Sequence, residues 1–207
     1  RLVNQLIDAS IKTSQTPQII MSSSTQEERD NEYGRSKREG RELLKQWAEK
    51  SGALFTGLII PNVFGPFGRP YYNSVVSTFA YQITHKESPK IEVDASMKLI
   101  YVDQLVNEIY SHINKQTNDA EFYVDHQFEL TVTDVLKKMK HFYEYYMINK
   151  TYPALDEQVD ICMFNVFRSY IDPTFFPVSF QVHQDDRGLF VETVKANSGG
   201  QFSFSTT

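Results

Sequence analysis

The sequence predicts an α/β fold with a parallel sheet, followed by the first strands of an all-β domain. Three observations lead to this prediction. A short apolar run ends in a serine cluster and is followed by a helical pattern from about residue 33 to 50. A second, mostly apolar run over residues 53–60 suits a strand that is covered on both faces, as in parallel sheets. From about residue 175 onward, apolar and polar residues alternate as they do in strands.

The composition is that of an ordinary globular protein. The chain has 207 residues, of which 41% are hydrophobic and 23% are charged, and its net charge is −5. This mild acidity gives no reason to expect nucleic acid as a partner. No apolar run approaches the length of a membrane span, and no signal peptide is visible at the start. The single cysteine, Cys162, indicates a reducing compartment, so we expect a cytoplasmic protein.

The first half of the chain alternates between helical and strand patterns. Residues 1–14 predict a helix, because apolar side chains recur on one face. Residues 18–21 form an apolar run that predicts a buried strand leading into the serines. The charged segment 25–32 predicts a loop, and the helix over about 33–50 is expected to end near Gly52.

A loop rich in proline and glycine covers residues 61–70, at the carboxyl end of the second strand. Ligands bind at this edge in open α/β sheets. A helix is expected over residues 73–85, and Arg69 and Asn73 flank its start. A cation beside a helix N-terminus suits a diphosphate, so these two residues are candidates for substrate binding. The alternative is an ordinary capped helix with an arginine on its surface.

The following segment predicts shorter elements. We expect short strands over residues 90–93 and 99–103, a helix over about 103–114, and a short strand over 121–124. The run Thr131-Val132-Thr133-Asp134 fits a capping box for the next helix.

The last third combines an aromatic helix, a connection and strands. Val135, Leu136, Met139, Phe142, Tyr143 and Tyr146 follow helical spacing, and this stripe is interpreted as core or as a dimer interface. Residues 149–172 are expected to form a connection. Strands are then expected over residues 175–182 and, after a turn at Asp-Arg-Gly, up to about residue 192.

The strongest chemical signal lies around the serine cluster Ser22-Ser23-Ser24. Tyr33 and Lys37 are four residues apart and therefore share one face of a helix. An ammonium group near a phenol favours the phenolate form. A hydroxyl group from the end of the strand can bind the same substrate oxygen. This combination indicates a proton-transfer site for a carbonyl or an alcohol.

The spacing Tyr-x-x-x-Lys is weak on its own, and a second match exists at Tyr146 and Lys150. That pair has neither a preceding strand nor a serine cluster, so we interpret it as structural. The context of Tyr33 and Lys37 is what distinguishes them: a strand that ends in serines, followed by Tyr-Gly-x-Ser-Lys at the start of a helix.

At the serine cluster and at the segment from Tyr33 to Lys37, the sequence resembles the extended short-chain dehydrogenase/reductase family of sugar-nucleotide enzymes. The resemblance implies a Rossmann-like domain over residues 1–172, in which three side chains act beside a nicotinamide ring. By this resemblance Ser24 supplies the hydroxyl, and Ser23 or Thr25 takes its place if the register of the loop is shifted by one residue. Tyr33 is the acid/base, and Lys37 binds the ribose and favours the phenolate.

The same family carries an Asn-x-x-Gly-Pro segment after the second strand, and Asn62-Val63-Phe64-Gly65-Pro66 matches it. The resemblance implies that Pro61, Val63 and Phe64 contact the nicotinamide cofactor and that Asn62 contacts the sugar nucleotide. One departure is visible. Many relatives have an arginine for the diphosphate shortly before residues 99–103, and Met97 stands there.

A glycine-rich dinucleotide turn is absent from the sequence, since neither G-x-G-x-x-G nor G-x-x-G-x-x-G occurs. We therefore expect that the front of the domain is missing from this chain, together with the residues that choose between NADP and NAD.

The C-terminal segment carries a second resemblance. Residues 186–192 read Asp-Arg-Gly-x-Phe-x-Glu, which resembles the opening strands of cupin-type sugar-nucleotide epimerases. We expect residues 173–207 to begin a truncated cupin domain. Its zinc is expected only beyond residue 207, and no metal site is expected in this chain, because the five histidines lack ligand spacing.

A reductase domain followed by a cupin resembles the CapF-type family of bifunctional capsular polysaccharide enzymes. The resemblance implies NADPH-dependent reduction of the C4 ketone of a UDP-linked 2-acetamido-2,6-dideoxy hexose, coupled to C3 epimerisation by the cupin. This activity belongs to the biosynthesis of UDP-N-acetyl-L-fucosamine. It also implies NADP(H) as cofactor, a UDP-linked amino sugar as substrate and a homodimer.

Two alternatives remain open at the level of the sequence. One is a sugar-nucleotide 4,6-dehydratase or epimerase on the same scaffold. Dehydratases place Asp-Glu directly after the catalytic hydroxyl, where this chain has Thr25-Gln26, although Glu27 and Glu28 follow. The other is a non-catalytic dimerisation module, which the absence of a glycine-rich turn favours for the chain as it stands.

Overall fold

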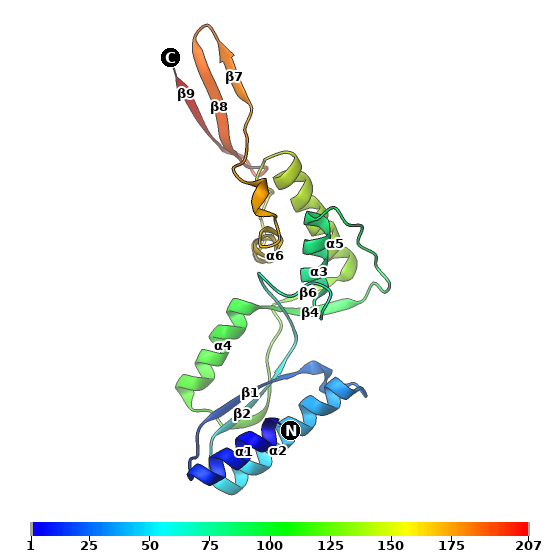
Figure 1. The fold of residues 1–207 in the computed structure, drawn as a ribbon, viewed down its shortest axis with the longest axis vertical. Helices are drawn as coiled ribbons and strands as arrows, with labels where there is room; N and C mark the ends of the chain where they lie inside the picture. The colour runs from blue at the N-terminus through cyan, green and yellow to red at the C-terminus, as the bar shows by residue number, and fades with distance from the viewer. Residues whose placement is uncertain (1, 207) are drawn as a thin grey trace. The chain divides into compact units, whose positions relative to one another are not determined.

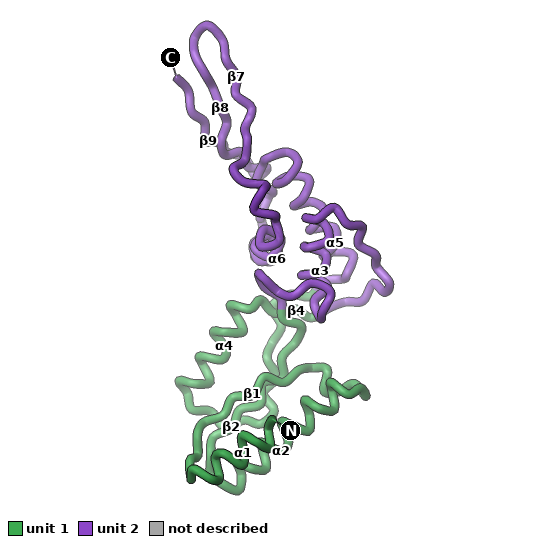
Figure 2. The backbone as a smooth tube through the Cα atoms, in the orientation of Figure 1, with its two compact units in different colours: residues 1–63, 98–129 green, residues 64–97, 130–207 purple. Residues whose placement is uncertain are grey.

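The computed structural model describes residues 2–206, and the chain divides into two compact units. Unit 1 contains the described residues up to 63 together with residues 98–129, and unit 2 contains residues 64–97 and those from 130 onward (Figure 2). None of the described helices combines the length and the apolar character needed to span a bilayer.

Unit 1 is built on a parallel sheet of three strands. These are β1 (Ile19–Ser24), β2 (Phe55–Ile60) and β5 (Asp119–Tyr123), in the order β1-β2-β5 (Figure 1). The helix α2 (Glu32–Ser51) connects β1 to β2, as a parallel pair requires. The predicted α/β fold with a Rossmann-like parallel sheet is thereby confirmed. β1 extends through the serines, three residues beyond the apolar run over residues 18–21.

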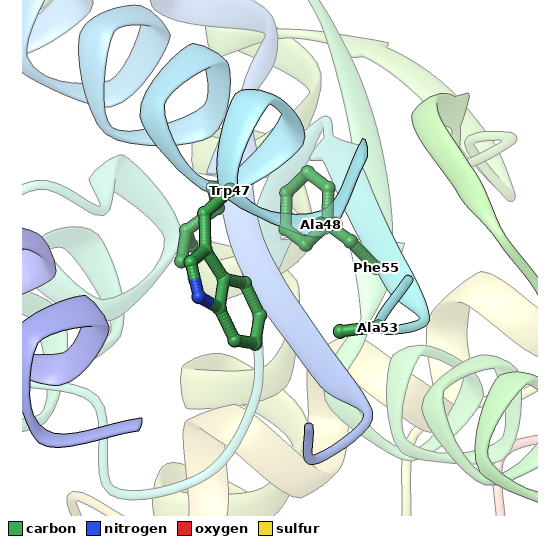
Figure 3. Close-up of a cluster of buried hydrophobic side chains, with 5 residues drawn as sticks. Trp47, Ala48, Ala53 and Phe55 are labelled. Atoms are coloured by element: carbon green, nitrogen blue, oxygen red, sulfur yellow. The ribbon is translucent and has the colours of Figure 1, made fainter. Parts of the chain in front are cut away.

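Helices cover both faces of this sheet. On one face lie α1 (Leu2–Thr13) and α2, and on the other lies α4 (Val102–Lys115) (Figure 1). The first face buries Leu44, Trp47, Ala48, Ala53 and Phe55 (Figure 3). The second face buries Leu58, Ile60, Ile100, Leu105 and Val124. Because β2 is buried along its whole length, its sequence reads as an apolar run and not as an alternation.

The ends of α2 follow ordinary capping rules. Asn31 precedes the helix, and its side chain accepts a hydrogen bond from the backbone N–H of Gly34 at 2.8 Å. At the other end Gly52 adopts φ +73°, a conformation that glycine reaches without a steric penalty. The helix therefore begins one residue before Tyr33, close to the predicted start.

A second sheet, in the order β3-β4-β6, contains the short strands β3 (Asn62–Phe64), β4 (Ser96–Tyr101) and β6 (Phe128–Thr131). Neither β3 nor β6 was predicted, because strands of three or four residues form through partners that lie far away in the sequence. The predicted strand over residues 90–93 is wrong. That segment is a loop, and Val93 in it is 73% exposed.

Three helices form the core of unit 2: α3 (Val75–Thr84), α5 (Val132–Phe142) and α6 (Gln158–Arg168). The predicted capping box at Thr131 and Asp134 is confirmed, and α5 continues as a π-helix over Tyr143–Ile148. The predicted connection over 149–172 is wrong, since it contains α6. This helix buries Val159, Cys162, Met163, Phe164, Val166 and Phe167.

The C-terminal part forms an antiparallel sheet of β7 (Val182–Asp185), β8 (Gly188–Lys195) and β9 (Gln201–Thr206). The turn at Asp-Arg-Gly falls where it was predicted, and the side chain of Asp185 accepts a hydrogen bond from the backbone N–H of Arg187 at 2.8 Å. The strand predicted over 175–182 is mostly wrong. Only Val182 of that range lies in a strand, and Pro177 has no N–H to donate to a sheet.

Candidate active site

The candidate site begins at the carboxyl end of β1. Ser23 and Ser24 point to opposite faces of the sheet, as successive residues of a strand do. Ser23 is buried, and its hydroxyl group donates to the carboxylate of Glu27. Ser24 is half-buried, and its Oγ accepts a hydrogen bond from the backbone N–H of Gln26 at 3.2 Å. The proton of Ser24 is therefore available to a ligand, whereas that of Ser23 is not.

Tyr33 and Lys37 lie on the first two turns of α2, beside this strand end. The Nζ atom of Lys37 donates a hydrogen bond to the backbone oxygen of Ser22 at 2.9 Å and lies 5.7 Å from the centroid of the Tyr33 ring. Tyr33 is 47% exposed, so this residue is accessible to a ligand. The structure thus brings the ammonium, the phenol and the serine end of β1 together within unit 1.

The position after Tyr33, Gly34, has no room for a side chain. A Cβ atom at this position would lie 2.3 Å from the backbone oxygen of Gln26 and 2.6 Å from that of Arg29. The first turn of α2 therefore packs directly on the backbone of the short 3-10 helix over Thr25–Glu28. This contact couples the position of Tyr33 to the turn that follows Ser24.

A buried ion pair lies behind the site, and sequence reasoning missed it. Glu27 and Arg41 are each 5% exposed, and the guanidinium group donates to both carboxylate oxygens at 2.9 to 3.1 Å. Hydrogen bonds to the Glu27 carboxylate raise the pKa of Arg41 above its ordinary value. The two residues are separated by a loop and lie on different elements, so no local pattern reveals the pair.

The segment after β2 lies at the same edge of the sheet, because Ser24 and Ile60 are register partners. Pro61 is buried, while Asn62 and Val63 are exposed. The side chain of Asn62 donates a hydrogen bond to the backbone oxygen of Lys98 at 3.2 Å. The structure therefore places Pro61, Asn62 and Val63 at the carboxyl edge of the sheet, and their binding roles stay predictions.

The remaining candidates belong to unit 2. Phe64 is buried, with 2% of its surface exposed. The guanidinium carbon of Arg69 lies 5.6 Å from the ring centroid of Tyr72, and Asn73 is exposed. The helix α3 is capped by Ser74, whose Oγ accepts from the backbone N–H of Ser77 at 3.2 Å. The substrate roles of Arg69 and Asn73 stay predictions.

The second Tyr-x-x-x-Lys match takes part in packing. Tyr146 packs among aromatic rings, with its ring centroid 5.2 Å from that of Phe164 and 6.0 Å from that of Phe175, and burial raises its pKa. The Nζ atom of Lys150 donates to the backbone oxygen of Met147 at 2.7 Å and lies 4.0 Å from the Phe175 centroid. The ammonium of Lys150 therefore faces Phe175 and a backbone oxygen, as expected for a structural pair.

Comparison with known proteins connects this geometry to a family. A model of the NAD dependent epimerase/dehydratase family matches residues 11–125, more than half of the chain. A UDP-2-acetamido-2,6-beta-L-arabino-hexul-4-ose reductase from Pseudomonas aeruginosa is 32% identical over 192 residues, which are 91% of this chain and 51% of that protein.

Solved structures give the same result. The crystal structure of the capsular polysaccharide assembling protein CapF from Staphylococcus aureus matches with a TM-score of 0.85 and 30% identity, over 98% of this chain and 56% of that one. A UDP-glucose 4-epimerase from Thermotoga maritima, at 23% identity and a TM-score of 0.58 over 67% of this chain and 50% of that one, shares the fold.

The chain spans about half the length of the relatives that it matches. The resemblance to CapF-type enzymes that the sequence predicted is confirmed by these matches. The chain belongs to the NAD dependent epimerase/dehydratase family.

Proposed function

We propose that this chain is the reductase part of a longer sugar-nucleotide oxidoreductase, which reduces the C4 ketone of a UDP-linked 2-acetamido-2,6-dideoxy hexose with NADPH. The observation that carries the proposal is the cluster of Ser24, Tyr33 and Lys37 at the carboxyl edge of the parallel sheet, with the Lys37 ammonium bonded to the Ser22 backbone. The name of the Pseudomonas aeruginosa relative, a reductase of a UDP-linked hexul-4-ose, supports this choice of substrate.

The residues at this edge fit a nicotinamide cofactor. An ammonium group carries three donors, and Lys37 uses one of them on the Ser22 backbone, which leaves donors for the hydroxyl groups of a ribose. Exposed Val63 offers an apolar contact for the ring, and the buried Pro61 lies two residues before it. Once bound, the cofactor supplies the hydride for C4 of the sugar.

The chain's own residues then handle the charge that develops on the C4 oxygen. In this proposal Tyr33 donates its hydroxyl proton to that oxygen, which completes the alcohol. The positive charge of Lys37 stabilises the phenolate that Tyr33 leaves behind. Ser24 donates a hydrogen bond to the same oxygen, which stabilises the developing alkoxide. A proton from solvent restores Tyr33, since this side chain is exposed.

The other predicted contacts complete the proposal. Asn62, Arg69 and Asn73 bind the UDP-linked amino sugar, and Phe64 is one of the cofactor-binding residues. Residues 1–172 belong to the reductase domain, and residues 173–207 open a cupin domain whose zinc and C3 epimerase residues lie beyond residue 207. The longer protein is cytoplasmic and forms a homodimer.

The structure weakens the dehydratase alternative. A dehydratase needs a carboxylic acid next to the catalytic hydroxyl, and Glu27 is the carboxylate that the sequence left open for this role. Glu27 is 5% exposed and is hydrogen-bonded to both Arg41 and Ser23, so its carboxyl group is held away from a substrate. Glu28, the last residue of the 3-10 helix, is exposed and stays the carboxylate open for this alternative.

The test supplies the longer protein with the UDP-linked 4-keto-6-deoxy amino sugar and NADPH deuterated at the transferred position. We expect NADPH oxidation and a product that carries deuterium at C4. A parallel reaction with UDP-N-acetylglucosamine and NAD⁺ detects a dehydratase by loss of water. Binding of NADPH without deuterium transfer to the keto sugar contradicts the proposal, and absence of NADPH binding favours the non-catalytic module.

A further inference from the structure

The buried pair of Glu27 and Arg41 is the most heavily connected polar group in unit 1. Besides both oxygens of Glu27, the guanidinium group of Arg41 reaches the backbone oxygen of Ala120 on β5 at 3.1 Å. It also forms ion pairs with Glu42 and Glu121 at 3.2 Å each. The side chain of Arg41 therefore connects α2 both to β5 and to the turn that follows β1.

The sheet is shaped to let Arg41 pass. A Cβ atom at Gly57 on β2 would lie 2.8 Å from Cδ of Arg41 and 2.4 Å from the backbone oxygen of Ala120. The aliphatic part of Arg41 thus crosses β2 where the strand has no side chain. This fit is an observation independent of the ion pair, and it indicates that the path of the arginine is built into the fold.

On its other side the pair holds the turn that carries the candidate hydroxyl. Glu27 lies on the 3-10 helix, and it accepts a hydrogen bond from Ser23 in addition to those from Arg41. In the same turn the backbone N–H of Gln26 donates to Oγ of Ser24. The Gln26 backbone oxygen packs against Gly34, next to Tyr33. Displacement of Glu27 is therefore expected to move both Ser24 and Tyr33, the two residues proposed to bind the substrate oxygen.

We propose that Glu27 and Arg41 are positioning residues, which hold the Ser24 hydroxyl in line with Tyr33 so that both meet one substrate oxygen. This inference rests on the proposed function. Neither residue touches the substrate, because both side chains are buried on the sheet side of the turn. Their charges neutralise each other, and the forked guanidinium fixes direction as well as distance.

The first experiment replaces the pair in the longer protein by apolar residues of similar size, in the double variant Glu27→Leu/Arg41→Met. This change leaves no buried charge without a partner, and such replacements often preserve stability. We expect kcat to fall by about 10- to 100-fold, since misplacement of a catalytic group by about an ångström has this effect. The KM for NADPH stays within about twofold of wild type, because Lys37 and its partner on β1 are untouched.

Two further variants sharpen the test. Arg41→Lys keeps the positive charge but loses the forked guanidinium group. We therefore expect its kcat to lie between that of the double variant and that of wild type. The matched control is Arg35→Gln, which removes an ion pair of the same helix with Asp30 at 2.8 Å, both side chains being largely exposed. We expect kcat and stability of this control to match wild type. A double variant that folds and keeps the wild-type kcat overturns the inference.

A readout without activity separates this inference from the proposed function. Amide hydrogen exchange at Gln26 and Gly34 is expected to become faster in the double variant, or in Arg41→Lys if the double variant does not fold. Unchanged exchange overturns the inference even if the enzyme is inactive. If Tyr33→Phe leaves turnover intact, the proposed function fails, and the exchange rates alone then decide whether the pair holds the turn.

Discussion

Replacement of Tyr33 by phenylalanine is expected to lower turnover of the keto sugar by about 10²- to 10⁴-fold, the usual contribution of a positioned acid. The variant loses the proton donor but keeps the ring. Binding of NADPH is expected to remain, because Lys37 keeps its hydrogen bond to the Ser22 backbone. The measurement is steady-state NADPH oxidation with the UDP-linked 4-keto sugar, together with a separate titration of NADPH binding.

The chain supplies a matched control at Tyr146, which has the same spacing to a lysine. Its ring packs with Phe164 and its side chain is half-buried, so Tyr146→Phe removes one hydroxyl group without exposing a cavity. We expect turnover within about twofold of wild type for this variant, as for a substitution remote from the chemistry. Equal rates for wild type and Tyr33→Phe would remove Tyr33 from the mechanism and favour the non-catalytic module.

The Gly34→Ala variant is expected to lose both stability and turnover. The added methyl group would meet the backbone oxygens of Gln26 and Arg29 at 2.3 and 2.6 Å, and backbone atoms move less readily than the end of a side chain. Overpacking of this kind typically lowers the free energy of unfolding by about 1–3 kcal/mol. Relief of the clash displaces the turn that holds Ser24, so turnover falls as well.

Gly40→Ala is the matched control for this substitution, since both glycines lie in α2. A Cβ atom at Gly40 would have its nearest contacts with side-chain atoms, Cε of Met21 at 3.2 Å and Cγ2 of Val3 at 3.4 Å. Alanine is also the better helix former by roughly 0.5–1 kcal/mol. Urea unfolding is expected to show Gly40→Ala as stable as wild type or slightly more stable. Wild-type stability and turnover in Gly34→Ala would contradict this prediction, because the turn after Ser24 would then accommodate the methyl group without loss of stability.

The strands and helices around the site were predictable because their patterns are local. The apolar run of β2 and the helical spacing of α2 each need only their own residues. The choice between Ser23 and Ser24 was left open, since a shift of one residue in a strand exchanges its two faces. The structure favours Ser24 over Ser23, because Ser23 is buried against Glu27 and Ser24 is not.

The misses have physical reasons as well. The short strands β3 and β6 depend on pairing with β4, which no local window contains. The helix α6 did carry a signal, since Val159, Cys162, Met163 and Val166 follow helical spacing behind the Glu157–Asp160 capping box. The pair of Glu27 and Arg41 forms only when the turn and the helix pack, so no local pattern identifies either residue as the partner of the other.

A crystal structure of the longer protein with NADP⁺ and the UDP-linked 4-hydroxy product tests the central claim most directly. The account predicts that the C4 oxygen of the sugar lies within about 3 Å of both the Tyr33 hydroxyl and the Ser24 hydroxyl. It also predicts that Lys37 contacts the nicotinamide ribose. A sugar bound away from Tyr33, with this side chain still open to solvent, would contradict the assignment of the active site.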